Sequence, residues 1–181
     1  MNRLSELNSA NEEQAVTMVT PLIERAPEIA RRVAGRRPFQ SSGQLCSAIR
    51  SELLKLSEDE QIVLFRAHPE LAPENPLAMT GESQSEQGRL DLTSDENEHR
   101  TRLDKLNAAY RDKFGFPFVT ALVRHPNIES VLTEFEQRLS GDRMSEIQQA
   151  IEQIVVVCSS RVQASFGADG SEISQDASTG G

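Results

Sequence analysis

A repeated helix-start pattern constrains the fold of this chain more than any other feature. In this pattern a Ser or Thr is followed three residues later by Glu, and each side chain satisfies a free backbone N–H group at the helix start. Four such pairs stand where a helical pattern begins: Ser9 with Glu12, Ser57 with Glu60, Ser83 with Glu86, and Thr93 with Glu96. The pattern therefore predicts a chain built mainly from helices.

Apolar residues also recur every three or four positions, as expected for helices that bury one face. The predicted helices cover about 9–19, 27–33, 42–56, 58–68, 83–90, 93–114, 128–139 and 143–166, with short helical turns after Thr20 and after Phe118. Residues 70–82 contain Pro73, Pro76 and Gly81 and are expected to form a loop. No second strand is available to pair with 116–123, so the fold class is all-α, a single compact domain of about eight helices.

The domain is expected to span residues 1–166. Residues 167–181 are rich in Gly, Ser and Asp, and we predict that they form a disordered C-terminal tail. The segment from Tyr110 to Val119 holds the only Tyr and three of the seven Phe, next to Gly115 and Pro117. This combination predicts that a long helix ends at Gly115 and that the aromatic residues form a shaped wall.

Charge and composition exclude several classes of partner. The net charge is −9, from 19 basic and 28 acidic residues, which argues against nucleic acid and against an anionic membrane surface. No stretch is apolar enough to cross a bilayer, and the N-terminus does not resemble a signal peptide. Cys46 and Cys158 lie far apart without neighbours at metal-ligand spacing, so we expect no metal site and a cytoplasmic, reducing location.

Few residues are candidates for acid–base chemistry. His68 follows a predicted helix and precedes Pro69, where the negative end of the helix dipole favours a protonated imidazole. A carboxylate nearby would hold its tautomer and raise its pKa, and Glu86 is the candidate for that role. On this residue alone, a surface or helix-capping His is the favoured interpretation.

Other candidate residues could recognise a polar or anionic substrate. Ser83 and Glu86 are expected to cap a helix whose free N–H groups attract an anion, and Gln87 could contact an amide or urea edge. Arg161 follows the apolar run 155–158. Such an Arg usually extends to the surface, but one that points inward is a natural partner for a carboxylate.

Three motifs occur together and in order. They are His68-Pro69-Glu70-Leu71, Ser83-x-x-Glu86-Gln87, and the block from Leu106 to Phe118 with Asn107, Tyr110, Lys113, Gly115 and Pro117. With Arg37-Pro38-Phe39 and the closing helix that carries Arg161, the chain resembles the 2-oxo-4-hydroxy-4-carboxy-5-ureidoimidazoline (OHCU) decarboxylase family over roughly Leu4 to Phe166.

This resemblance implies an all-α fold, usually a homodimer, and decarboxylation of OHCU to (S)-allantoin without a cofactor or metal. It implies His68 and Glu86 as the catalytic residues. It further implies substrate contacts from Pro69, Ser83, Gln84, Ser85, Glu86, Gln87, Phe118, Val119, Thr120, Ala121, Leu122 and Arg161. Urate oxidase and hydroxyisourate hydrolase are the expected pathway neighbours.

Two alternatives remain open at this point. The chain could be a non-catalytic helical interaction protein of the same fold, in which case side chains would fill the space beside Phe118. It could also be a decarboxylase or hydrolase acting on a related ureido acid, which only substrate tests would distinguish.

Overall fold

The computed structural model describes residues 2–94 and 98–169, and the regular secondary structure of its described part is helical, as predicted. The α-helices are α1 (Arg3–Ser9), α2 (Glu12–Val19), α3 (Pro27–Ala34), α4 (Ser42–Leu54), α5 (Glu58–Ala67), α6 (Gly81–Gly88), α7 (Arg100–Phe114), α8 (Ile128–Leu139) and α9 (Arg143–Phe166). Short 3₁₀ helices lie at η1 (Thr20–Leu22), η2 (Pro76–Ala78) and η3 (Leu122–Arg124). No strand occurs within the described ranges.

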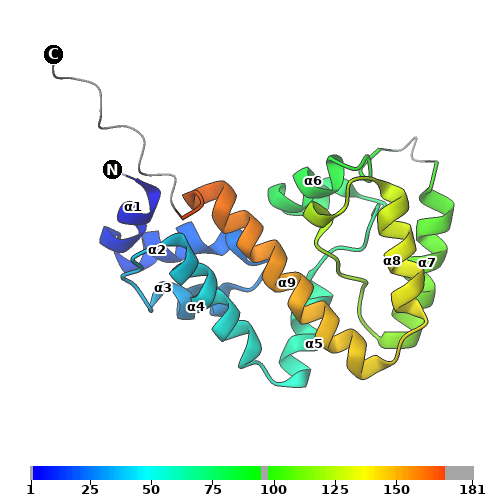
Figure 1. Ribbon diagram of the computed structural model, residues 1–181, viewed down its shortest axis with the longest axis horizontal. Helices are drawn as coiled ribbons and strands as arrows, with labels where there is room; N and C mark the ends of the chain where they lie inside the picture. The colour runs from blue at the N-terminus through cyan, green and yellow to red at the C-terminus, as the bar shows by residue number, and fades with distance from the viewer. Residues whose placement is uncertain (1, 95–97, 170–181) are drawn as a thin grey trace, which may run out of the picture.

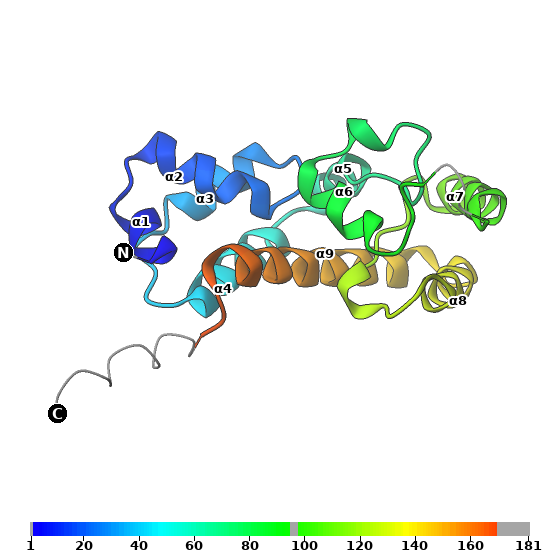
Figure 2. The ribbon, with the colours of Figure 1, turned by 90° about the horizontal axis from the view of Figure 1, so that it is seen from above.

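The helix α9 is the longest element and crosses the middle of the molecule (Figure 1). On one side, α1 to α4 form a group in which α4 packs along α9. On the other side, α7 and α8 pack against each other, and α5 and α6 lie between the two groups (Figure 2). One continuous apolar core joins these layers. Because α9 touches both groups, it fixes their relative positions.

The predicted helix starts are partly confirmed. Ser57 and Glu60 form the predicted capping box of α5, and the side chains of Ser41 and Asn127 cap α4 and α8. The Ser9–Glu12 pair is not a cap, because Ser9 ends α1 and the side chain of Asn11 caps α2.

The Ser83–Glu86 cap is also wrong, since α6 begins two residues earlier with Thr80 as its cap. Glu96 of the fourth pair lies outside the described residues, and α7 begins only at Arg100.

Chain breaks lie largely where the sequence places them. Gly115 ends α7 with φ of +80°, a left-handed conformation that glycine adopts without steric cost. Beyond it, 116–121 has no regular secondary structure and leads into η3 at Leu122, so the predicted turn and short helix is shorter than expected. None of the helices in the described ranges combines the length and apolar character needed to span a bilayer.

Only the first residues of the predicted C-terminal tail are described, and 170–181 lie outside the described residues. The side chain of Asp169 accepts a hydrogen bond of 3.0 Å from the backbone N–H of Gly43, in the first turn of α4. A Cβ at position 43 would come within 2.5 Å of that carboxylate, so glycine allows this close approach.

Candidate active site

His68 occupies the C-cap of α5, directly before Pro69. Its Nδ1–H donates a hydrogen bond of 2.9 Å to the carbonyl of Leu64. A carbonyl can only accept, so Nδ1 carries the proton and Nε2 carries a lone pair. Nε2 is buried and has no hydrogen-bond partner among the described residues. A buried acceptor without a partner is unfavourable, and it marks a position where a ligand proton would be stabilised.

Burial lowers the pKa of His68 by more than the hydrogen bond to the Leu64 carbonyl and the charge of Glu24 raise it, and the charge of Arg161 adds a smaller lowering effect. The expectation that the helix dipole or a carboxylate makes this imidazole cationic is therefore wrong. The cost of desolvating a charged ring outweighs both effects. His68 is a neutral base at neutral pH, with Nε2 as the available atom.

Arg161 points inward from α9 and is buried. Its Nε and Nη2 donate to the carboxylate of Glu86 at 2.8 and 3.0 Å, and Nη2 also donates to Glu24 at 3.0 Å. The hydroxyl of Ser83 and the carbonyl of Pro21 accept from the same guanidinium at 3.3 Å. Burial alone would lower the pKa of Arg161, but Glu86 and Glu24 raise it above its usual value, so the group stays charged.

Glu24 is a charged residue of this cluster that the sequence analysis missed. Its side chain is 1% exposed, and it accepts hydrogen bonds from the hydroxyls of Thr80, at 3.0 and 3.1 Å, and Ser83, at 2.8 Å. The only local signal is that a Glu directly follows the apolar pair Leu22-Ile23. Its partners lie more than 50 residues away, so no spacing rule could identify them.

The motif Ser83-x-x-Glu86-Gln87 contributes to this cluster in a different way from that expected. Glu86 binds Arg161, and no hydrogen bond or ion pair joins it to His68 in the part of the chain that the structure describes. Both polar atoms of Gln87 are used by the loop after His68, since Oε1 accepts from Ala72 N–H at 2.9 Å and Nε2 donates to the carbonyl of Glu70 at 3.0 Å. In this structure Gln87 therefore holds the loop that follows His68-Pro69.

A cavity of about 340 Å³ lies beside the arginine. Ser85, which is exposed, lines it together with Glu86 and Arg161. Gln84 lies apart from this cavity and donates at 2.9 Å to the carbonyl of Met79. A small anionic molecule could thus reach the guanidinium from the side that Glu86 occupies.

The predicted wall at 118–122 is buried and lies against both α6 and α9. Arg89, at the end of α6, donates to the carbonyl of Leu122, and the N–H of Ala121 donates at 3.0 Å to the side chain of Gln153 on α9. The ring of Phe118 stacks on Phe135, with centroids 3.9 Å apart. The structure therefore brings 118–122 next to the helices that carry Glu86 and Arg161.

Within the described ranges, no group of three or more His, Cys, Asp and Glu side chains is arranged to hold a metal ion. The groups available for chemistry in this region include a half-buried imidazole with a buried Nε2, one guanidinium with two carboxylates, and the backbone segment 118–122.

A sequence model of the family described as OHCU decarboxylase matches residues 8–163. The chain belongs to the OHCU decarboxylase family. It is 33% identical over 165 residues to the 2-oxo-4-hydroxy-4-carboxy-5-ureidoimidazoline decarboxylase of Halalkalicoccus jeotgali, covering 90% of this chain and 92% of that one.

A further relative and a solved structure are similar to this chain. The chain is 32% identical over 169 residues to a uric acid degradation bifunctional protein of a Bacillus species, covering 92% of this chain and 32% of that protein. A crystal structure of OHCU decarboxylase in the presence of (S)-allantoin has the same fold, with a TM-score of 0.66, 19% identity, and coverage of 87% of this chain and 99% of that one.

Proposed function

We propose that this chain is a carboxy-lyase that decarboxylates OHCU to (S)-allantoin in the degradation of urate, without a cofactor. Membership of the OHCU decarboxylase family supports the reaction. The observation in the structure that carries the proposal is the state of His68, whose neutral ring presents a buried Nε2 lone pair with no partner among the described residues. This is the form of histidine that can accept a proton from substrate.

The chemistry of the substrate explains why a base of this kind suffices. When CO₂ leaves C4 of OHCU, the electron pair of the broken bond moves into the neighbouring ring C=N. The result is an enol at C4 and a negatively charged ring nitrogen, which takes a proton from water. The enol becomes allantoin when the hydroxyl proton leaves oxygen and a proton reaches C5. Nε2 of His68 can accept the first proton and deliver it to one face of C5, so a single imidazole balances both steps.

Arg161 acts as the cation of the reaction in this proposal. Negative charge leaves the carboxylate as CO₂ departs, so a cation bound only to the carboxylate would stabilise the starting state. A cation near the ring and its oxygen atoms stabilises the charge that develops. Glu24 is buried beneath Arg161 and is its permanent partner, whereas Glu86 is 32% exposed and borders the cavity. We therefore assign Glu86 as the partner that orients the guanidinium of Arg161 toward the cavity.

The wall at 118–122 is proposed to bind the ureido group. The backbone N–H groups of Val119 and Thr120 find no hydrogen-bond partner among the described residues. Both residues are buried, and buried backbone groups are normally paired. A ureido oxygen accepts two such bonds, which supports this assignment.

The test uses OHCU generated in situ from urate by urate oxidase and hydroxyisourate hydrolase, followed by circular dichroism. Wild-type protein should produce optically active (S)-allantoin, and His68→Asn should lower the rate by about 10²- to 10⁴-fold. His99→Asn, the same change in a turn before α7, should leave the rate unchanged. Racemic allantoin forming at the spontaneous rate with wild-type protein would overturn the proposal in favour of another ureido acid or a non-catalytic role.

We also propose a homodimer in the cytoplasm, with urate oxidase and hydroxyisourate hydrolase as pathway neighbours. The family resemblance supports the dimer. The two free cysteines support the location in a reducing compartment. Burial raises the pKa of Cys158 to about 12, so this thiol stays protonated and unreactive. Light scattering of the purified chain would test the dimer, and a mass of one chain at micromolar concentration would contradict it.

A further inference from the structure

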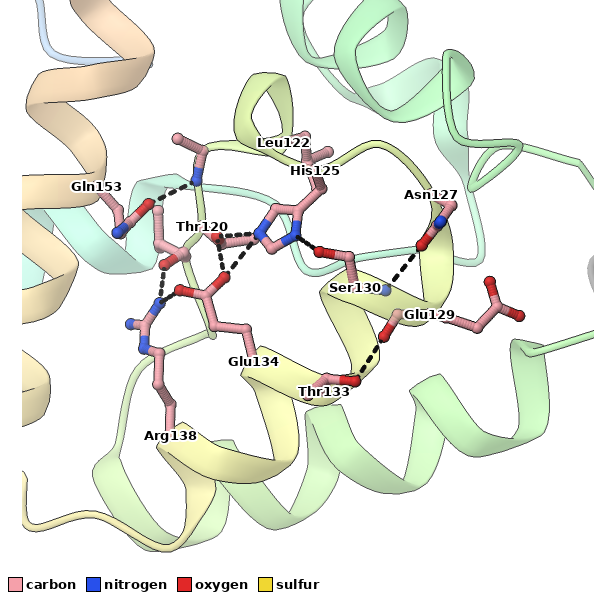
Figure 3. A network of polar contacts seen from close by, with 12 residues as sticks. Thr120, Leu122, His125, Asn127, Glu129, Ser130, Thr133, Glu134, Arg138 and Gln153 are labelled. Carbon is pink, nitrogen blue, oxygen red and sulfur yellow. Dashed lines mark hydrogen bonds and ion pairs between the residues drawn. The ribbon is translucent and has the colours of Figure 1, made fainter.

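The segment 118–122 keeps its shape through side chains of other helices. Arg138 of α8 donates from Nη1 at 2.7 Å to the carbonyl of Val119, and Gln153 of α9 accepts from the N–H of Ala121 (Figure 3). Arg89 donates to the carbonyl of Leu122. The backbone is thus held at three of its polar groups, and the N–H groups of Val119 and Thr120 lie next to the first of them, the Val119 carbonyl.

Glu134 of α8 binds the side chain of Thr120 in this segment. Its Oε2 accepts a hydrogen bond of 2.6 Å from the hydroxyl of Thr120 and one of 2.7 Å from Nε2–H of His125 (Figure 3). The other ring nitrogen, Nδ1, accepts from the hydroxyl of Ser130 at 2.7 Å. The proton positions follow from the carboxylate, which can only accept, so Nε2 is the protonated nitrogen. Glu134 therefore fixes His125 and Thr120 together.

Arg138 is itself immobilised from the opposite side. Glu146 of α9 accepts from its Nε and Nη2 at 3.0 to 3.1 Å, and its guanidinium lies 4.6 Å from the centroid of the Phe118 ring. The Tyr110 hydroxyl donates to the same Glu146 carboxylate. Glu134 accepts a long hydrogen bond of 3.5 Å from Arg138. The arginine is rigid, and Glu134 is the half-buried link between this rigid group and Thr120.

We propose that Glu134 is a positioning residue of the active site, which holds Thr120 so that the backbone N–H groups of 119 and 120 face the substrate. The inference rests on the proposed function of this site. It explains why a carboxylate with no assigned role lies against the segment, with a histidine and a threonine both bonded to one of its oxygens. The expected consequence is weaker substrate binding when Glu134 is altered, because the free N–H groups would no longer be preorganised.

The test compares KM and kcat for OHCU in Glu134→Gln with the wild type. We expect KM to rise about fivefold or more, the equivalent of one lost hydrogen bond, with kcat within about twofold. A purely structural role would reduce the fraction of folded enzyme, which lowers apparent kcat and leaves KM unchanged. Glu136→Gln is the matched control, since Glu136 is also on α8 but binds Arg102 at the surface.

Thr120→Val removes the hydroxyl at nearly constant volume and keeps the inference testable if Glu134→Gln does not fold. It should raise KM by a similar factor, and the double variant should exceed neither single variant, because both changes break one connection. An unchanged KM in Glu134→Gln, or fully multiplicative effects in the double variant, would overturn the inference while the proposed function stands. If wild-type protein makes no (S)-allantoin, the proposed function fails and this inference fails with it.

Discussion

Arg138 and Arg161 are two buried arginines with similar immediate partners and different surroundings. Each binds one fully buried carboxylate, Glu146 or Glu24, and a second that is half-exposed, Glu134 or Glu86. Around Arg138 the remaining space holds aromatic rings and a backbone carbonyl. Around Arg161 there is a cavity of about 340 Å³. The same ionic arrangement therefore serves as a scaffold where it is enclosed by protein and as a candidate site where it borders open space.

The largest effect is expected when Glu86, the partly exposed carboxylate beside Arg161, is changed. Glu86→Gln should lower kcat/KM about 10²-fold or more, because Arg161 loses the partner that orients its guanidinium toward the cavity. The free energy of unfolding should change by less than about 1 kcal/mol, since Glu24 still compensates the charge. Urea denaturation and initial rates on the same preparation measure both. A loss of stability as large as the loss of activity would show that Glu86 belongs to the scaffold.

The second largest effect is a loss of stability, expected when the enclosed cluster around Arg138 is changed. Glu146→Gln should lower the free energy of unfolding by about 3 kcal/mol, because Arg138 and the Tyr110 hydroxyl both lose a buried anionic acceptor. Urea denaturation measures the change, and kcat of the folded fraction should stay within about twofold of the wild-type value. Unchanged stability together with a large loss of kcat would reverse the roles assigned to the two arginines.

A third prediction concerns pH. The folded-state pKa of His68 lies below its unfolded value of about 6.5, so between these two values the unfolded chain binds more protons. The free energy of unfolding contributed by this residue is complete above about pH 6.5 and decreases as pH falls toward the lowered pKa, by at most about 1.4 kcal/mol per pH unit.

His68→Gln should reduce the slope of stability against pH in this window by that amount. Urea denaturation from pH 5 to 8 measures it. An identical slope in the wild type and the variant would mean that the ring is solvated and titrates normally.

The smallest effect is expected for an ion pair at the surface. Arg102 and Glu136 are both half-exposed, so water and salt screen their attraction. Glu136→Gln should change the free energy of unfolding by less than about 0.5 kcal/mol and leave kcat/KM unchanged. A larger effect would show that burial is not what distinguishes Arg138 and Arg161 from other arginines of this chain.

Local rules predicted much of the fold because helix ends depend on neighbouring residues. Ser57 and Glu60 form the capping box that their spacing indicates, and Gly115 ends α7 in the left-handed conformation. The same spacing misled at Ser83 and Glu86. There, both side chains are used by distant partners, Glu24 and Arg161, while Thr80 caps the helix. A short motif cannot show that a tertiary partner has replaced the local one.

The candidate site shows the same limit. The family motifs identified His68 and Arg161, and the structure brings Glu24 to them from a segment without a motif. The tautomer of His68 depends on the Leu64 carbonyl and its lowered pKa on burial, and neither property can be read from His-Pro. The contacts of Glu134 depend on how α8 packs against 118–122, which only the tertiary structure reveals.

The long helix α9 contributes, from one face, to both arginine clusters and to the segment 118–122. Glu146 holds Arg138, Gln153 holds the backbone of Ala121, and Arg161 binds Glu86. At about 100° and 1.5 Å per residue, these positions lie within roughly 80° of one another around the helix. One inserted residue between Gln153 and Arg161 would turn the arginine by about 100° and move it away from its partners. Natural variation in α9 should therefore include many exchanges on its exposed face and almost no changes in its length.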